Sequence, residues 1–391
     1  MARRALLAWE GGAGRGHVLT LKSVAEALGD RFVFDAVLCR MDHASELTPV
    51  CERVSAGPSF RYQRQHRTGP DAISTSTWGE FLADLGFRDQ EFLSRRIAQW
   101  QALIRGEGIS LVIGDFAPCA LMAARGLGVA AVAVGVGYSV PPSHLPEFPI
   151  LLPDKAQRYY DESEIVETIN AAAQPHGVPA IHAFPEVYAC DIQLVRTLPM
   201  LDPYHSDRSE PSIPPLADVA MGFAGGGDEI FIYFSTIESN DDALMQAVGD
   251  LGVPTRIFMP GVPQDIAARL SAQGVIVERM PVPVDDIARR TRLMIHAGQH
   301  GILCLGLAAG LPQIAIPQHL EQLYHARQAE AAGALRIVSK TGFEPSFFRD
   351  TVRQCYEDRE MGLRAAELAR RLRPQFAADA RQMMAERLAL L

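Results

Sequence analysis

The stretch between Leu293 and Gln322 constrains the fold of this chain more than any other part of the sequence. A short apolar run ends at His296 and is followed by a turn that contains two glycines. An apolar segment over residues 302–309 comes next, breaks at a Gly-Leu-Pro sequence, and leads into a second apolar run over residues 313–316. This succession predicts a strand, a glycine-bearing turn, a helix and a second strand.

A turn of this kind suits the binding of a phosphate group. The first N–H groups of a helix lack partners within the helix, and the positive end of the helix dipole lies beside them. Gly298 and Gly301 let the backbone approach a ligand closely, and the imidazoles of His296 and His300 add hydrogen-bonding groups. Because any parallel βαβ unit can carry glycines here, the loop alone leaves a ligand site and an ordinary turn equally open.

The order of residues across this stretch resembles the donor-binding signature of GT-B fold glycosyltransferases of family 1, the sterol, antibiotic and plant natural-product enzymes. That signature runs His-x-Gly-x-x-Gly, a helix, Gly-x-Pro, a strand, Pro, and an acidic residue followed by Gln. The matching residues are His296, Gly298, Gly301, Gly306, Gly310, Pro312, Pro317, Glu321 and Gln322. The chain departs from the pattern at Ile302, where the family usually has Thr or Ser, and at Glu321, where it usually has Asp.

The resemblance implies an α/β architecture in which two Rossmann-like parallel-sheet domains face a central cleft. We expect an acceptor-binding domain over residues 1–222 and a nucleotide-sugar-binding domain over residues 223–372. Residues 373–391 are expected to form a helix that crosses back to the N-terminal domain. Three consecutive glycines at residues 225–227 mark the linker.

The resemblance also implies where the parts of the donor are held. It places the nucleobase on the backbone of Met280, Pro281 and Val282, and the sugar hydroxyls on Glu321 and Gln322. The residues expected around the diphosphate are His296, Gly298, Gln299, His300, Gly301, Ser235 and Thr236.

The start of the chain repeats the pattern of a strand, a glycine-rich loop and a helix. An apolar run over residues 5–9 precedes Gly-Gly-Ala-Gly-Arg-Gly-His, and residues 21–28 carry apolar side chains at helical spacing. A dinucleotide-binding fingerprint needs a third glycine where this chain has His17, and no acidic residue closes a clear second strand. A nicotinamide or flavin enzyme is therefore disfavoured.

His17 and Asp115 are the candidate catalytic residues. The loop that ends at His17 resembles the family's Gly-His-Val element, in which the histidine takes the proton from the acceptor. A hydroxyl is a weak nucleophile, and an imidazole titrates near neutral pH. Asp115 follows an apolar run over residues 111–114, and an aspartate at the matching place in the family orients the histidine. Without the resemblance, His17 reads as a loop or helix cap and Asp115 as a helix N-cap.

The acceptor is expected to lie near Gly14, Tyr138 and His144. Residues 138–149 form a stiff loop rich in proline and aromatic residues, directly after a predicted strand. Such loops often line acceptor pockets, and an ordinary surface excursion is the other interpretation.

Composition limits the partners and the compartment. The 391-residue chain has a net charge of −9 and no basic block, which argues against nucleic acid as a main partner. Its six cysteines are scattered, as is typical of reduced thiols in a cytoplasmic protein. The longest apolar span, residues 117–136, is interrupted by Arg125 and several glycines, so no transmembrane segment is expected. Peripheral contact with a membrane stays open.

The expected function is inverting transfer of a sugar from a nucleotide diphosphate sugar to an apolar small-molecule acceptor. We expect no cofactor and no essential metal, because no Asp-x-Asp element follows a strand and the fold normally uses hydrogen-bond donors instead. Three alternatives share the same fold: a lipid-linked-sugar transferase, a nucleotide-sugar epimerase, and a non-catalytic nucleotide-sugar-binding protein. Ile302 favours the last, since it removes a hydroxyl that would contact a phosphate.

Overall fold

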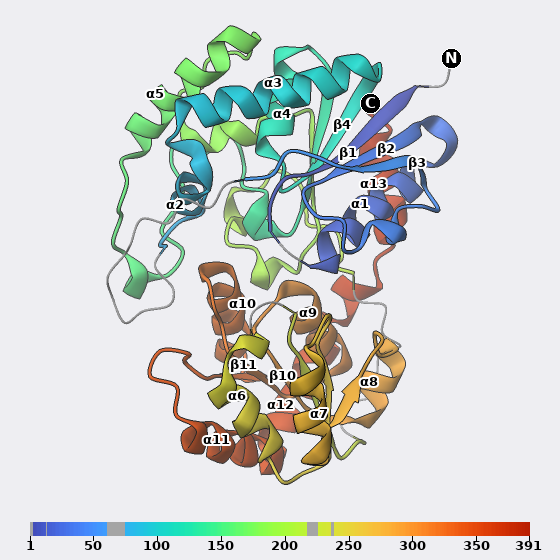
Figure 1. Ribbon diagram of the computed structural model, residues 1–391, viewed down its shortest axis with the longest axis vertical. Coiled ribbons are helices and arrows are strands. Elements are labelled where there is room, and N and C mark those ends of the chain that lie inside the picture. Colours follow the sequence, from blue (N-terminus) through green and yellow to red (C-terminus); the bar gives the residue numbers. More distant parts are fainter. Residues whose placement is uncertain (1–2, 13, 61–74, 217–225, 236–237) are drawn as a thin grey trace. The chain divides into compact units, whose positions relative to one another are not determined.

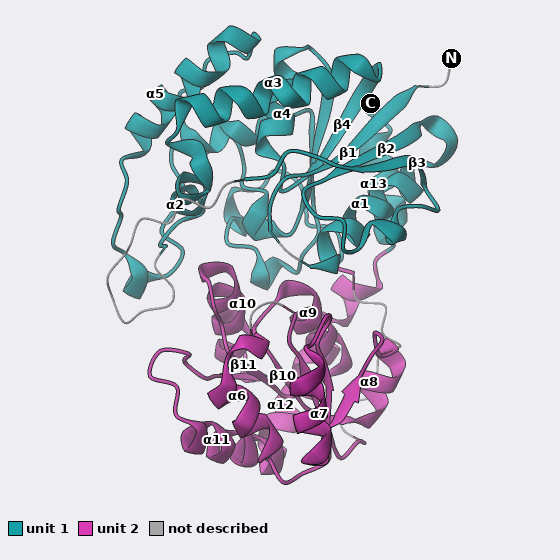
Figure 2. Ribbon diagram, viewed as in Figure 1, with its two compact units in different colours: residues 1–67, 75–214, 379–391 teal, residues 68–74, 215–378 magenta. Residues whose placement is uncertain are grey.

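The computed structural model describes residues 3–12, 14–60, 75–216, 226–235 and 238–391 (Figure 1). The chain divides into two compact units (Figure 2). The first unit comprises residues 1–67, 75–214 and 379–391, and the second comprises residues 68–74 and 215–378. The predicted domain boundary at residue 222 stays a prediction, because residues 217–225 are not among those described.

The first unit is built on a six-stranded parallel sheet with the strand order β3-β2-β1-β4-β5-β6. Its strands are β1 (Arg4–Trp9), β2 (Val33–Leu38), β3 (Cys51–Ala56), β4 (Ile109–Asp115), β5 (Ala130–Gly135) and β6 (Ile192–Val195). β1 and β4 are neighbours at the centre, and the strand order moves outward from them in opposite directions. Their carboxyl ends therefore flank the place where open α/β sheets hold ligands.

Helices cover this sheet and bury its apolar strands (Figure 1). They are α1 (Arg15–Leu28), α2 (Trp78–Leu82), α3 (Gln90–Gly106), α4 (Pro118–Gly126), α5 (Glu162–Ala173) and α13 (Ala380–Leu388). α1 buries Leu21, Val24 and Leu28, which lie on the face predicted from the sequence. α13 packs on α1, where Arg31 donates a hydrogen bond to the carbonyl oxygen of Leu388 at 3.2 Å.

The second unit repeats the same topology with the strand order β12-β11-β10-β7-β8-β9. Its strands are β7 (Glu229–Tyr233), β8 (Thr255–Phe258), β9 (Ile276–Glu278), β10 (Thr291–His296), β11 (Gln313–Ala315) and β12 (Leu335–Ile337). All neighbouring strands pair in parallel, and β7 and β10 form the central pair. The predicted α/β class with two parallel sheets is therefore confirmed.

The helices of the second unit include the one predicted after the glycine turn. They are α6 (Asp242–Gly249), α7 (Gln264–Ala272), α8 (Val284–Arg290), α9 (His300–Ala309), α10 (Leu320–Ala331), α11 (Pro345–Glu357) and α12 (Arg359–Ala377). Across the ranges that the structure describes, no helix combines the length and the apolar content needed to cross a membrane.

Alternate residues of the central strands build two cores in this unit. On one face, Ile232 of β7 and Ile295 of β10 belong to a cluster completed by residues of α6 and α11. On the other face, Phe231 and Met294 pack with Leu305 of α9. Side chains alternate between the faces of a strand, so both faces must be apolar when helices cover both. This packing fixes the carboxyl ends of β7 and β10, from which the two site-forming loops leave.

Candidate active site

The first unit brings His17 and Asp115 together at the carboxyl ends of β1 and β4. Asp115 is the last residue of β4 and is paired in register with Trp9, the last residue of β1. The helix that follows β1 in the chain is α1, whose first turn carries His17. His17 Nδ1 and Asp115 Oδ1 are 2.8 Å apart. The two predicted catalytic residues therefore form a hydrogen-bonded pair.

Burial shapes the electrostatics of this pair. The side chain of Asp115 is 3% exposed, whereas that of His17 is 23% exposed and so accessible to a small molecule. Burial raises the pKa of the Asp115 carboxyl, and the adjacent His17 imidazole acts in the opposite direction. Asp115 is not the N-cap of the following helix, because α4 begins at Pro118 with Ala117 at that position. Its bonded partner is the imidazole.

The loop after β1 is shaped around the imidazole of His17. Trp9 stacks on the ring, with centroids 5.1 Å apart and an interplanar angle of 24°. Gly12 has φ +88°, and a Cβ atom there would lie 2.8 Å from His17 Nε2. Any larger residue at position 12 would therefore displace the nitrogen that points away from Asp115. Gly14 is the N-cap of α1, with φ 103°.

An aromatic cluster lies beside this pair. The ring of Trp78 is 4.9 Å from that of Phe116 and 5.0 Å from that of Tyr138. Phe116 follows Asp115 directly and has φ 47°, an uncommon conformation for a bulky residue and one that often marks a functional site. Tyr138, predicted near the acceptor, belongs to this cluster, whereas His144 is exposed. Trp78 could not be predicted as part of this cluster, because its place beside Phe116 depends on the tertiary fold.

In the second unit, His296 is completely buried at the end of β10. Its Nδ1 accepts a hydrogen bond from the Gly298 N–H at 2.9 Å, and its Nε2 lies 2.7 Å from Gln313 Oε1. Burial lowers the pKa of His296 to about 4, so the ring is neutral near pH 7. The predicted contact of His296 with a phosphate would have to replace one of these two bonds, and it stays a prediction.

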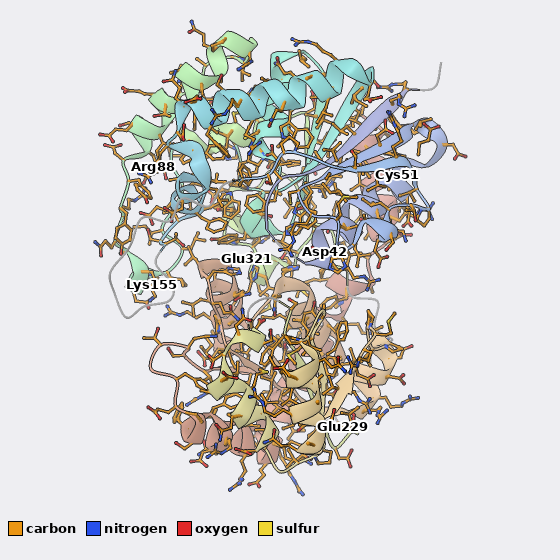
Figure 3. All side chains as sticks on the ribbon, in the orientation of Figure 1. Asp42, Cys51, Arg88, Lys155, Glu229 and Glu321 are labelled. Carbon is orange, nitrogen blue, oxygen red and sulfur yellow. The ribbon has the colours of Figure 1, made fainter. Side chains whose placement is uncertain are left out.

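The loop after β10 packs closely against the first turn of α10. Gly298 has φ +92°, and a Cβ atom there would lie 2.9 Å from the carbonyl oxygen of Gln322. Gln322 is 2% exposed, and its Oε1 accepts a hydrogen bond from the Gln318 N–H at 2.8 Å. Glu321 is half-buried in the first turn of α10 (Figure 3). Whether Glu321 and Gln322 contact sugar hydroxyls stays a prediction.

Gln299 joins the loops that follow the two central strands. Its Oε1 accepts a hydrogen bond from the Ala297 N–H at 3.1 Å, and its Nε2 donates to Ser235 Oγ at 3.1 Å. A longer contact of 3.4 Å connects Nε2 to Glu238, whose side chain is buried. The structure thus brings Ser235 and Gln299 together, as expected for one site, and Thr236 lies outside the described residues.

The first turn of α9 leaves its backbone N–H groups without a side-chain cap. The helix begins at His300 with Gln299 at the N-cap, and no side chain caps it. No described atom lies within 4 Å of where a Cβ atom of Gly301 would be, so the backbone is open there. His300 packs edge-on against His325, with ring centroids 5.2 Å apart. Unsatisfied N–H groups and the helix dipole make such a terminus favourable for a phosphate.

The segment predicted to hold the nucleobase is a loop between β9 and α8. Met280 is 72% exposed, which is unusual for a large apolar side chain. Val282 packs against the core cluster that contains Phe231 and Met294. The loop is therefore anchored to the sheet by one side chain, while its role toward a nucleobase stays a prediction.

Solved structures of glycosyltransferases share this fold. The calicheamicin glycosyltransferase CalG4 has a TM-score of 0.68 at 15% identity, over 100% of this chain and 98% of that chain. VinC, solved in complex with dTDP, has a TM-score of 0.64 at 15% identity, over 99% of each chain. The spinosyn rhamnosyltransferase SpnG, complexed with spinosyn aglycone, has a TM-score of 0.63 at 18% identity, over 98% of this chain and 99% of that chain. The predicted GT-B fold is thereby confirmed.

Neither a protein-family model nor a curated protein sequence matches this chain.

Proposed function

We propose that this protein is an inverting glycosyltransferase that moves a sugar from a nucleotide diphosphate sugar to a hydroxyl of an apolar small molecule. The observation that carries the proposal is the hydrogen bond between His17 and Asp115 at the carboxyl ends of β1 and β4. A partly exposed imidazole held by a buried carboxylate is a standard arrangement for removing a proton from a weak nucleophile.

In the first unit, His17 acts as the general base. Asp115 accepts from Nδ1–H, which fixes the tautomer that leaves a lone pair on Nε2. Nε2 takes the acceptor's hydroxyl proton while the acceptor oxygen forms a bond to the anomeric carbon of the sugar. The bond from that carbon to the diphosphate breaks, and the diphosphate leaves with the electron pair. Attack from the opposite face inverts the anomeric configuration.

In the second unit, the loop after β10 stabilises the leaving diphosphate. The N–H groups at the start of α9 and the positive end of its dipole would stabilise the negative charge that develops on the diphosphate. Gln299 holds this loop to Ser235, and the buried His296 sets its path through Gly298. Because these donors take the part that a metal ion would otherwise play, we expect transfer without a bound metal or other cofactor.

The compared structures support both substrate classes. VinC was solved with dTDP and SpnG with spinosyn aglycone, so a nucleoside diphosphate and an aglycone are ligands of proteins with this fold. In the present chain, the aromatic cluster of Trp78, Phe116 and Tyr138 lies beside the imidazole. Aromatic side chains favour apolar or aromatic acceptors, because they offer apolar area at low entropic cost.

Two experiments in sequence test the proposal. A thermal-shift screen with nucleoside diphosphates and their sugars should identify the donor, since a ligand at 100 times its Kd stabilises the folded state by about 2.7 kcal/mol. The selected donor is then incubated with aromatic and aliphatic alcohols, and the anomeric configuration of the product is read by NMR. An α-linked donor should yield a β-linked product. Epimerised or hydrolysed donor, formed equally well without an acceptor, would contradict the proposal.

A further inference from the structure

Glu10 has a buried carboxyl group with no part in the reaction described above. It follows β1 directly, its side chain is 2% exposed, and it lies between Trp9 and the glycine loop that leads to His17. Burying a carboxyl group costs free energy unless hydrogen bonds compensate for the lost water. A group of this kind at the end of the central strand therefore calls for an explanation beyond packing.

Both oxygens of Glu10 accept hydrogen bonds from N–H groups of other elements. Oε1 accepts from the indole N–H of Trp100 in α3, and Oε2 accepts from the Cys119 N–H in the first turn of α4 at 2.9 Å. The N-cap residue of α4 is Ala117, which offers no side-chain acceptor. Glu10 thus takes the capping role for α4 from a distant part of the chain.

The backbone of Glu10 reaches the other side of the His17–Asp115 pair. Its N–H donates to the carbonyl oxygen of Phe116 at 3.3 Å, and its own carbonyl oxygen accepts from the Phe60 N–H at 3.2 Å. Phe116 is the residue in the left-handed conformation directly after Asp115. Glu10 therefore contacts the turn that follows Asp115 and also begins the loop that leads to His17.

We propose that Glu10 is a positioning residue: its carboxyl group fixes the loop after β1 against the turn after β4, and so sets the hydrogen bond between His17 and Asp115. The role follows from connectivity. Trp9, one residue before Glu10, stacks on the imidazole, and Gly12, two residues after it, closes against Nε2. A shift of Glu10 moves both contacts at once. The inference concerns the same pair on which the proposed function rests.

The groups around Glu10 act on its carboxyl group in opposite directions. Burial raises the pKa of the Glu10 carboxyl to about 8, and the N–H donors of Trp100, Cys119 and Ala120 oppose that rise, as does the charge of Arg96. An apolar side chain would cost less free energy to bury than this carboxyl group. The benefit of Glu10 therefore lies in the geometry that its N–H donors impose on the two loops.

The test compares Glu10→Gln and Glu10→Ala with Asp35→Asn, which removes a different buried carboxylate of the same unit. Glu10→Gln keeps one acceptor oxygen, and Glu10→Ala keeps none. The first readout is the imidazole ¹⁵N signals of His17 in histidine-labelled protein, assigned by their loss in His17→Asn. We expect these signals to move in Glu10→Ala, to move less in Glu10→Gln, and to stay unchanged in Asp35→Asn. His17 signals that superimpose on those of the wild type in both Glu10 variants would overturn the inference.

The second readout is transfer activity at saturating donor. Misplacing a general base by a fraction of an ångström costs part of its contribution, so we expect kcat to fall about tenfold or more in Glu10→Ala. Recovery toward the wild-type value in Glu10→Gln supports positioning, and an equal loss in Asp35→Asn argues against it. The NMR signals test whether Glu10 positions the His17 imidazole, and this test does not depend on activity. Moved signals with unchanged kcat would uphold the positioning role and refute His17 as the base instead.

Discussion

Acidification is expected to destabilise the second unit through His296. The ring is fully buried, its Nδ1 accepts the Gly298 N–H, and its Nε2 is bonded to Gln313. Protonation would place a hydrogen on Nδ1 opposite another N–H and a charge in the apolar interior. Burial accordingly lowers the pKa of His296 from 6.5 to about 4.

The size of the effect follows from this pKa difference. Because the folded-state pKa lies below that of the unfolded chain, the unfolded chain binds more protons, so stability is full above pH 6.5 and falls as the pH drops toward 4. The full difference is worth about 3 kcal/mol, at about 1.4 kcal/mol per pH unit. Between about pH 7.5 and about pH 5, roughly 2 kcal/mol of it should be lost.

The assay compares the wild type with His296→Asn, whose amide oxygen can accept from the Gly298 N–H and which does not titrate. All three tryptophans lie in the first unit, at positions 9, 78 and 100, so intrinsic fluorescence would not report on the second unit. Hydrogen exchange of peptides covering residues 291–309 measures the local free energy of opening instead. Between the two pH values the wild type should lose about 2 kcal/mol more than the variant. Equal losses would refute the reasoning, and His205→Asn, at an exposed site, controls for removal of an imidazole.

Further perturbations test other parts of the two units. Asp115→Asn should lower kcat by about 100-fold or more with little change in the KM for the donor, because the amide cannot stabilise the imidazolium of His17; steady-state kinetics checks this. Gly298→Ala should cost about 1–3 kcal/mol and weaken nucleoside diphosphate binding, measured by calorimetry, since φ is +92° and Gln322 O leaves no room for Cβ. Trp9→Leu should reduce kcat several-fold through loss of the ring stack, whereas EDTA should leave transfer unchanged.

Three results would contradict these predictions. Wild-type kcat in Asp115→Asn would show that the buried carboxylate does not support the base. Unchanged nucleotide affinity in Gly298→Ala would separate the loop after β10 from the donor, and Gly301→Ala, at a position with open space, is the matched control for stability. Activity abolished by EDTA and restored by a divalent cation would contradict the metal-independent mechanism.

The resemblance to family 1 glycosyltransferases predicted the pairing of His17 with Asp115, and the topology of the sheet explains it. Each residue follows an apolar run, and parallel strands place their carboxyl ends at one edge of the sheet. The strand order puts β1 next to β4, so the two residues meet although 98 positions separate them. The donor loop could be anticipated in the same way, since Gly298 and Gly301 mark the turn between β10 and α9.

The two edge strands of the first unit could not be predicted, because their sequences lack a clear hydrophobic pattern. β3 (Cys51–Ala56) is an edge strand whose sequence, Cys-Glu-Arg-Val-Ser-Ala, is only partly buried, so it carries charged residues where a central strand would be apolar. β6 (Ile192–Val195) has four residues and follows a long irregular segment. Short edge strands need little apolar surface, and hydrophobic periodicity cannot separate them from loops.

The partners of buried polar groups were also beyond the reach of sequence patterns. The sequence shows that His296 precedes a glycine turn, which suggests that its imidazole donates a hydrogen bond to a phosphate. It does not show that Gln313, 17 residues later, bonds one ring nitrogen and that the turn itself bonds the other. The sequence likewise does not predict a role for Glu10, because its hydrogen-bond donors lie in α3 and α4, 90 and 109 positions away. Such contacts depend on packing between elements rather than on local spacing.

The most direct test of the account is the transfer rate of His17→Ala with donor and acceptor both saturating, measured beside the affinity of the same variant for the nucleoside diphosphate. The account predicts that transfer falls by about 100-fold or more, the usual contribution of a general base, while nucleotide binding by the second unit is unchanged. Transfer at the wild-type rate would contradict it.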